Sequence, residues 1–271
     1  MAPPRTSGDD AAFRPHLDWA DNTSPMLADA IARDPIVIVP VGSTEQHGHH
    51  LPVGTDAFAA ETVARHAAED WSDERPLLLL PTLWTGLSPH HMGLAGSITL
   101  TTSTFVDVVV DVCVSLLHHG VRRILLLNGH GGNVAALNVA LARLGERGAD
   151  VPRVAALTYF HLLGPRSAEL RDTRTGGTGH AGEFETSLML ATHGTLVRMD
   201  EAVTCYPEHP SRYLSSDLFD GAPARRYLPF DALSPSGTLG DPSAASHEKG
   251  ERIARACAEA LGAFLQDFGS W

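Results

Sequence analysis

Two apolar runs decide the fold of this chain: PIVIVPVGS at residues 35–43 and RILLLNGHGG at residues 123–132. Both are rich in β-branched residues or leucine, and both stop abruptly at glycine, serine or asparagine. Continuous apolar runs of this length are typical of strands that are covered on both faces. PLLLLPTLWTG at 76–86 and RVAALTYF at 153–160 have the same character, so we expect strands there too.

Helical stretches are expected between and after these strands, at residues 56–70, 102–119, 133–147, 183–193 and about 247–268. The alternation of strand and helix predicts an α/β fold with a mainly parallel sheet and helices on both sides. Right-handed crossovers would place the carboxyl ends of all strands at one edge of the sheet. Open α/β sheets bind their ligands at that edge.

Composition restricts the class of protein. The chain has 271 residues, 43% of them hydrophobic and 19% charged, which predicts a single globular domain over residues 1–271. Its net charge of -12 disfavours nucleic acid and membrane surfaces as partners. Three dispersed cysteines and the lack of a secretory signal favour a cytoplasmic location. Residues 1–15 are expected to be a mobile lead-in, and the Pro-, Ser- and Gly-rich residues 203–246 a long irregular excursion, either a lid or an oligomer contact.

The first candidate site is GSTEQHGHH at residues 42–50, directly after the first expected strand. The chain has 15 histidines against 20 Lys and Arg, which favours metal or acid–base chemistry if the histidines cluster. In an extended segment Glu45 and His47 project to the same side, and Gln46 points away. Asp56 is expected at the start of the next helix, where it is either a plain N-cap or a functional carboxylate.

Two further motifs are expected at the same edge. NGHGGN at 128–133 follows the expected strand at 123–128, so His130 should face the crevice that holds Glu45 and His47. GHAGEFETS at 179–187 places one imidazole and two carboxylates at the start of a helix. The stretch 177–182 also spells G-x-G-x-x-G, but the charged segment before it is no strand, so a dinucleotide site is rejected.

The chemistry of the three motifs points to hydrolysis. Carboxylates and imidazoles without thiolates suit Zn, Mn or Fe(II). A bridging carboxylate such as Asp56 could hold two such ions, which activate a water and polarise a carbonyl group. No G-x-S-x-G elbow and no Walker motif is present, so serine-hydrolase and P-loop chemistry have no support.

VPVGSTEQHGHHLPVGTD, NGHGGN and HAGEFETS, in this order, resemble the creatininase family of metal-dependent amidohydrolases. The resemblance runs from about residue 36 to the terminal SHEKGE segment. It implies a three-layer α/β/α sandwich, a centre with two divalent metal ions that hydrolyses C–N bonds, and a homo-oligomer, often a hexamer.

The resemblance also implies roles for individual residues. His180 would be the general acid and base. Glu183 is expected beside it in the catalytic set, as a support for the metal ligands or as a substitute ligand. The metal ligands would be Glu45, His47, Asp56, His130 and Glu185. Among them, Asp56 would bridge the two ions and Glu185 would complete the second site.

The substrate side departs from the family pattern. Creatininases have Tyr-Glu where this chain has Gly131-Gly132, and tryptophans where it has Phe160 and the glycine-rich stretch 176–179. These departures argue against creatinine as the substrate and predict a wider, glycine-lined pocket. Its expected substrate-binding residues are Gly131, Gly132 and Phe160. PHHMGLAGS at 89–97 matches a family loop, in which His91 either contacts substrate or is an ordinary loop histidine.

We therefore expect a binuclear metal-dependent amidohydrolase that cleaves an amide, lactam or formamide bond of a small molecule or short peptide through a metal-bound water. Within the family, the alternatives are the peptidase branch that trims the mycofactocin precursor and the formylaminopyrimidine deformylase branch. An alternative of another class is a non-catalytic metal-binding scaffold with the same fold.

Overall fold

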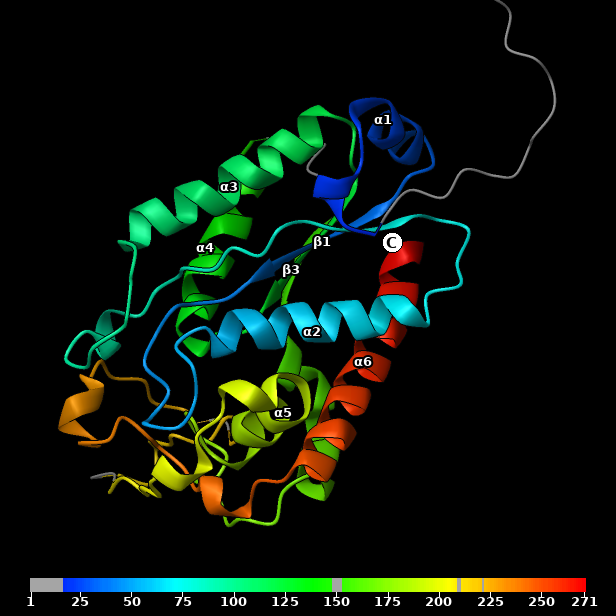
Figure 1. Cartoon of the computed structure of the whole chain (residues 1–271). Coiled ribbons are helices and arrows are strands. Elements are labelled where there is room, and N and C mark those ends of the chain that lie inside the picture. Colours follow the sequence, from blue (N-terminus) through cyan, green and yellow to red (C-terminus); the bar gives the residue numbers. More distant parts are fainter. Residues whose placement is uncertain (1–16, 148–152, 209–210, 221) are drawn as a thin grey trace, which may run out of the picture.

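The centre of the molecule is a four-stranded parallel sheet. The structure is a computed structural model that describes residues 17–147, 153–208, 211–220 and 222–271 (Figure 1). The strand order is β2-β1-β3-β4, and the strands are β1 (Ile36–Val41), β2 (Leu77–Leu79), β3 (Arg123–Asn128) and β4 (Arg153–Thr158). Val41 of β1 pairs with Asn128 of β3, and Asn128 pairs with Thr158 of β4. Three strands therefore end level with one another, at the edge where the sequence predicts the site.

Six α-helices surround this sheet in the described part of the chain: α1 (Ser24–Ala32), α2 (Thr55–Glu69), α3 (Thr102–His118), α4 (Val134–Gly145), α5 (Glu183–His193) and α6 (His247–Ser270). Short 3-10 helices lie between them: η1 (Trp19–Asp21), η2 (Pro89–His91), η3 (Gly131–Asn133), η4 (Tyr159–Glu169), η5 (Gly194–Leu196), η6 (Met199–Glu201), η7 (Phe230–Ala232) and η8 (Pro242–Ala244).

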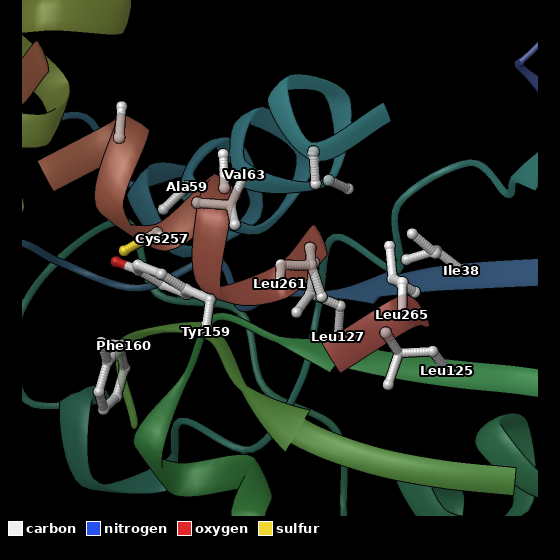
Figure 2. Close-up of a cluster of buried hydrophobic side chains, with 14 of the residues drawn as sticks. Ile38, Ala59, Val63, Leu125, Leu127, Tyr159, Phe160, Cys257, Leu261 and Leu265 are labelled. Carbon is white, nitrogen blue, oxygen red and sulfur yellow. The ribbon is translucent and has the colours of Figure 1, made fainter. Parts of the chain in front are cut away.

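The two faces of the sheet form two separate cores, because successive side chains of a strand point to opposite faces. Ile36 and Ile38 of β1 pack with residues of α2, α5 and α6. Val37 and Val39, one position along, pack with residues of α1, α3 and α4. Figure 2 shows the first core, in which Leu261 and Leu265 of α6 lie against the strands. The predicted three-layer α/β/α fold with a parallel sheet is confirmed.

Helix and strand bounds differ from expectation in two places. The run at 76–86 forms a regular strand only at Leu77–Leu79, because Pro81 has no N–H for the ladder. Beyond it the chain still follows β1, since the Leu83 amide donates to the Pro40 carbonyl. Helix α1 is absent from the expected elements, although Thr23 at its N-cap and Pro25 in its first turn are typical helix-start residues.

The segment around residues 203–246 covers the carboxyl edge of the sheet. In its described part it holds η7 and η8, and an antiparallel bridge joins Cys205 to Gly240. The expected lead-in at 1–15 lies outside the described residues. The G-x-G-x-x-G stretch follows turns and η4, not a strand, which agrees with rejecting the dinucleotide site. No helix among the described residues is long and apolar enough to span a membrane.

Candidate metal centre

Asp56 joins two of the predicted motifs. It lies in the first turn of α2, and only 2% of its surface is exposed. Its Oδ1 is 3.2 Å from Nε2 of His47, and its Oδ2 is 3.2 Å from Nδ1 of His130. His47 comes from the loop after β1 and His130 from the turn after β3, so the level strand ends bring both imidazoles to one carboxylate.

Backbone hydrogen bonds assign the tautomers of these two histidines. Nδ1 of His47 lies 3.1 Å from the Glu45 carbonyl oxygen, and Nε2 of His130 lies 3.0 Å from the Leu87 carbonyl oxygen. A carbonyl only accepts, so each of these nitrogens carries the proton of the neutral ring. The opposite nitrogen then faces the carboxylates. Metal-binding histidines typically have this arrangement.

Glu45 and Glu185 complete the ring of carboxylates around these imidazoles. Oε1 of Glu45 is 3.2 Å from Nδ1 of His130, and its Oε2 accepts a hydrogen bond of 2.5 Å from the Ser88 hydroxyl. Glu185 lies in the first turn of α5, where its Oε2 accepts from the Ala181 amide at 2.7 Å. Its Oε1 is 4.0 Å from Nε2 of His47. All five predicted metal ligands therefore meet.

The electrostatics of the cluster require positive charge. Burial raises the pKa of Glu45, and it raises the pKa of Glu185 to about 7. Burial lowers the pKa of His47, but Asp56, Glu185 and Glu45 raise it more strongly, to about 9. For Asp56, burial raises the pKa, and His47 and His130 lower it more, to well below its usual range. The buried carboxylates thus need protons or cations between them and the imidazoles.

The directions of the side chains favour cations over protons. Nε2 of His47 and Oδ2 of Asp56 are buried, yet neither has a hydrogen bond of acceptable geometry. Donor atoms of His47, Asp56 and Glu185 lie within 4.8 Å of one another, as do those of Glu45, His90 and His130. Oxygen and imidazole donors without thiolates suit Zn, Mn or Fe(II). The residues present therefore fit metal ions.

His180 lies beside these ligands and differs from them. Its Nε2 is 2.6 Å from the Gln46 carbonyl oxygen and so donates its proton there. Its Nδ1 faces Oε1 of Glu45 at 3.6 Å with a free lone pair. Burial and then the nearby His47 lower the pKa of His180 well below its ordinary value, so the ring is neutral. A neutral imidazole with one fixed N–H and one open nitrogen can accept a proton.

Gln46 belongs to the site, and the expectation that it points away is wrong. Residues 42–50 are a series of turns and isolated bridges, so the alternation of a strand does not hold there. Nε2 of Gln46 lies 2.8 Å from Nδ1 of His91 and 3.2 Å from the Gly237 carbonyl oxygen. His91, which is 1% exposed, presents its Nε2 to Oε1 of Glu45 at 3.3 Å. His91 is therefore a buried residue of the site and not an ordinary loop histidine.

Glu183 does not lie with the ligands. Its carboxylate accepts from the Asp172 and Thr173 amides at 2.8 and 3.0 Å, and it pairs with the buried Lys249 of α6. Both oxygens are thus occupied at the other side of the α5 start. Glu183 ties the chain before His180 to α6, and the expected catalytic or ligand role is not supported by its position.

The predicted substrate residues divide in the same way. Phe160 is 2% exposed and packs against Tyr159 and Phe219 in the core on the α6 side of the sheet. Gly131 has open space around it, but a Cβ at Gly132 would lie 2.3 Å from Nε2 of His130. The glycine at 132 therefore permits a close approach of His130, whereas Gly131 is exposed with open space around it.

Comparison with known proteins agrees with this geometry. The family model described as "Creatinine amidohydrolase" matches residues 20–265. A mycofactocin precursor peptide peptidase of Mycolicibacterium smegmatis is 36% identical over 81% of this chain and 79% of its own. The creatinine amidohydrolase of Pseudomonas putida is 31% identical over 93% of this chain and 95% of its own.

The relatives also include a more distant hydrolase and solved structures. The 3-dehydro-scyllo-inosose hydrolase of Thermotoga maritima is 26% identical over 90% of this chain and 81% of its own. A structure titled "Creatininase Mn" superposes with a TM-score of 0.77 and 28% identity, covering 93% of this chain and 98% of the other. The match of the family model and the similarity to its members show that the chain belongs to the creatininase family of hydrolases.

Proposed function

We propose that the chain is a binuclear metal-dependent amidohydrolase that cleaves an amide, lactam or formamide C–N bond of a small molecule or short peptide. The observation that carries this proposal is the position of Asp56 between two imidazoles, each of which turns one nitrogen to it while a backbone carbonyl holds the other. A carboxylate with one oxygen for each of two donor groups is suited to bridge two ions.

The ligands divide into two sets around this bridge. His47 and Glu185 would hold one ion with Asp56, and His130 and Glu45 would hold the other. The hydroxyl of Ser88 fixes the second oxygen of Glu45. Divalent ions in such a site lower the pKa of water and polarise a carbonyl group.

His180 would move the proton. Its Nδ1 has the open lone pair on the ligand side of the ring, while the Gln46 carbonyl holds Nε2–H and keeps the ring in this orientation. The ring can therefore accept a proton from the attacking group and deliver it to the leaving nitrogen. Glu183 would act only by holding the preceding loop to Lys249.

A short peptide is the second candidate substrate. The mycofactocin peptidase of M. smegmatis is 36% identical over 81% of this chain, and the creatinine amidohydrolase of P. putida is 31% identical over 93%. The open space at Gly131 supports a substrate larger than creatinine at this position. We therefore propose small amides and short peptides before creatinine itself.

Metal analysis and a substrate panel test the proposal together. Purified protein loaded separately with Zn, Mn or Fe(II) should contain close to two ions per chain. It should then hydrolyse at least one compound of a panel of lactams, formamides and short peptides. Fewer than one ion per chain would refute the metal centre. Two bound ions without turnover of any compound would support the non-catalytic scaffold. The homo-oligomer, with a hexamer as the family form, and the cytoplasmic location stay predictions.

A further inference from the structure

Phe230 covers the histidines that lie beside the proposed ligands. Its ring centroid is 4.0 Å from that of His91, 5.0 Å from that of His180 and 5.1 Å from that of His90. The ring belongs to η7, more than one hundred residues after His91 in the sequence. Three imidazoles from two separate loops therefore contact one phenyl ring from a third segment.

The chain after Phe230 is attached to the same residues. The Gly237 carbonyl accepts from Nε2 of Gln46 at 3.2 Å, and the Leu239 amide donates to the His180 carbonyl at 2.8 Å. Gly237 has a φ of +79°, and a Cβ there would lie 1.9 Å from Oε1 of Gln46. Residues 230–239 thus pass directly over Gln46 and His180, and η7 forms the outer end of this cover.

Phe230 covers one side of the histidine cluster. Phe230 itself is half-buried, whereas His91 and Glu45 are each 1% exposed. Two cavities of about 450 Å³ occur elsewhere, one beside Tyr206 and one beside Arg65, and neither includes a residue of the cluster. The ring lies against His91 and His180, so a substrate group that approaches His180 from this side meets the ring. No hydrogen bond holds a phenyl group, so aromatic contacts alone keep it in place.

We propose that Phe230 is a specificity-determining residue: its ring closes the approach to His180, and it forms the apolar wall against which the substrate group beside the scissile C–N bond packs. The substrate class that fits such a wall has a flat or apolar group at that position. This inference rests on the proposed amidohydrolase site for its second half, whereas the closure of the approach stands on the contacts of Phe230 alone.

Chemical modification of histidine tests the closure without any substrate. Metal-loaded wild type, Phe230→Ala and Phe230→Leu are treated with diethyl pyrocarbonate, and the rate at each histidine is followed by peptide mass spectrometry. His118 and His119 are exposed and serve as internal references. In Phe230→Ala, His91 and His180 should react several-fold faster than in wild type, with an intermediate rate in Phe230→Leu. Tyr227→Ala is the matched control, because Tyr227 is 66% exposed on the same segment.

An unchanged rate at both His91 and His180 in Phe230→Ala overturns the closure. An equal rise at both reference histidines also overturns it, because the whole protein would then have loosened. Tyr227→Ala should react as wild type does at every position. A rise at His180 of the same size in this control would show that the segment, and not the ring of Phe230, closes the site.

Two metal-chelating probes test the wall. Benzohydroxamate and acetohydroxamate share one metal-binding group and differ in a phenyl against a methyl group. Phe230→Ala should weaken benzohydroxamate binding to the loaded protein about threefold to tenfold more than acetohydroxamate binding, the range expected for one aromatic contact. Equal changes for both probes overturn the wall. Protein without bound metal would refute the proposed function instead, while the modification experiment would still measure the cover.

Discussion

Replacing Asp56 with Asn perturbs the proposed metal centre at the carboxylate that lies between His47 and His130. The side chain keeps its shape but loses its charge and exchanges one oxygen for an NH₂ group. In the structure the two oxygens face His47 and His130 at 3.2 Å each, so no orientation of the amide can serve both sides. We expect Asp56→Asn to lose both ions. Glu185→Gln, which touches only the side of His47, should lose one.

The expected size of the effect follows from linkage. An ion present at one hundred times its Kd stabilises the folded state by about 2.7 kcal/mol. A chain of 271 residues has an unfolding entropy of about 0.57 kcal/mol/K, from about 2.1 cal/mol/K per residue. Each ion should therefore raise Tm by about 5 °C, and two ions by about 10 °C.

Calorimetry with and without a chelator, combined with elemental analysis, measures this directly. Wild type should lose about 10 °C in Tm on chelation, Glu185→Gln about half of that, and Asp56→Asn close to none. Asp111→Asn, on the exposed face of α3, is the control and should behave as wild type does. The reasoning fails if Asp56→Asn still holds two ions, or if chelation leaves the Tm of wild type unchanged.

Three further outcomes are expected. His180→Gln should lower kcat by about 10²- to 10⁴-fold while the metal content of the protein stays at that of wild type; a loss of metal would instead make His180 a ligand. Lys249→Met leaves the Glu183 carboxylate buried without its cation and should lower the free energy of unfolding by about 3–5 kcal/mol in urea titrations. Adding Glu183→Gln should recover part of this loss, and a simply additive double variant would contradict the pairing. Burial raises the pKa of Asp217, but the Arg171 guanidinium and nearby amides lower it more. Because the folded pKa lies below the unfolded value of about 3.9, Asp217 stabilises the protein above that pH, and the contribution disappears as the pH falls through the folded pKa. Asp217→Asn should thus be less stable at pH 7 and show a shallower loss of stability on acidification; identical pH profiles would exclude this role.

Much of the fold could be predicted because it depends on local pattern. The apolar runs of β1, β3 and β4 are covered on both faces, and a strand of this kind is visible in one dimension. In β2 the regular strand ends at Leu79, because Pro81 has no N–H to donate to the neighbouring strand. Helix α1 carries a weak pattern because it is short and buries little, with Ala30 its one fully buried residue.

The proposed ligand set could also be predicted, since ligands need particular residue types at strand ends. Their convergence follows from parallel strands that end level with one another. The surroundings could not be predicted in this way. Gln46 and Glu183 each lie one or two residues from a proposed ligand. The sequence predicts that Gln46 points away from the site and that Glu183 belongs to it, whereas Gln46 contacts His91 and Glu183 pairs with Lys249.

The sequence by itself determined the order of the layers, the edge that carries the site and the residue types that meet there, because these depend on periodicity and on the chirality of crossovers. Only the tertiary structure decided which neighbours complete the site. Phe230 reaches His180 from fifty residues away through a segment without periodicity, and Phe160, at the end of a predictable strand, turns into the core. Contacts between distant loops depend on the path of the whole backbone, which no local pattern encodes.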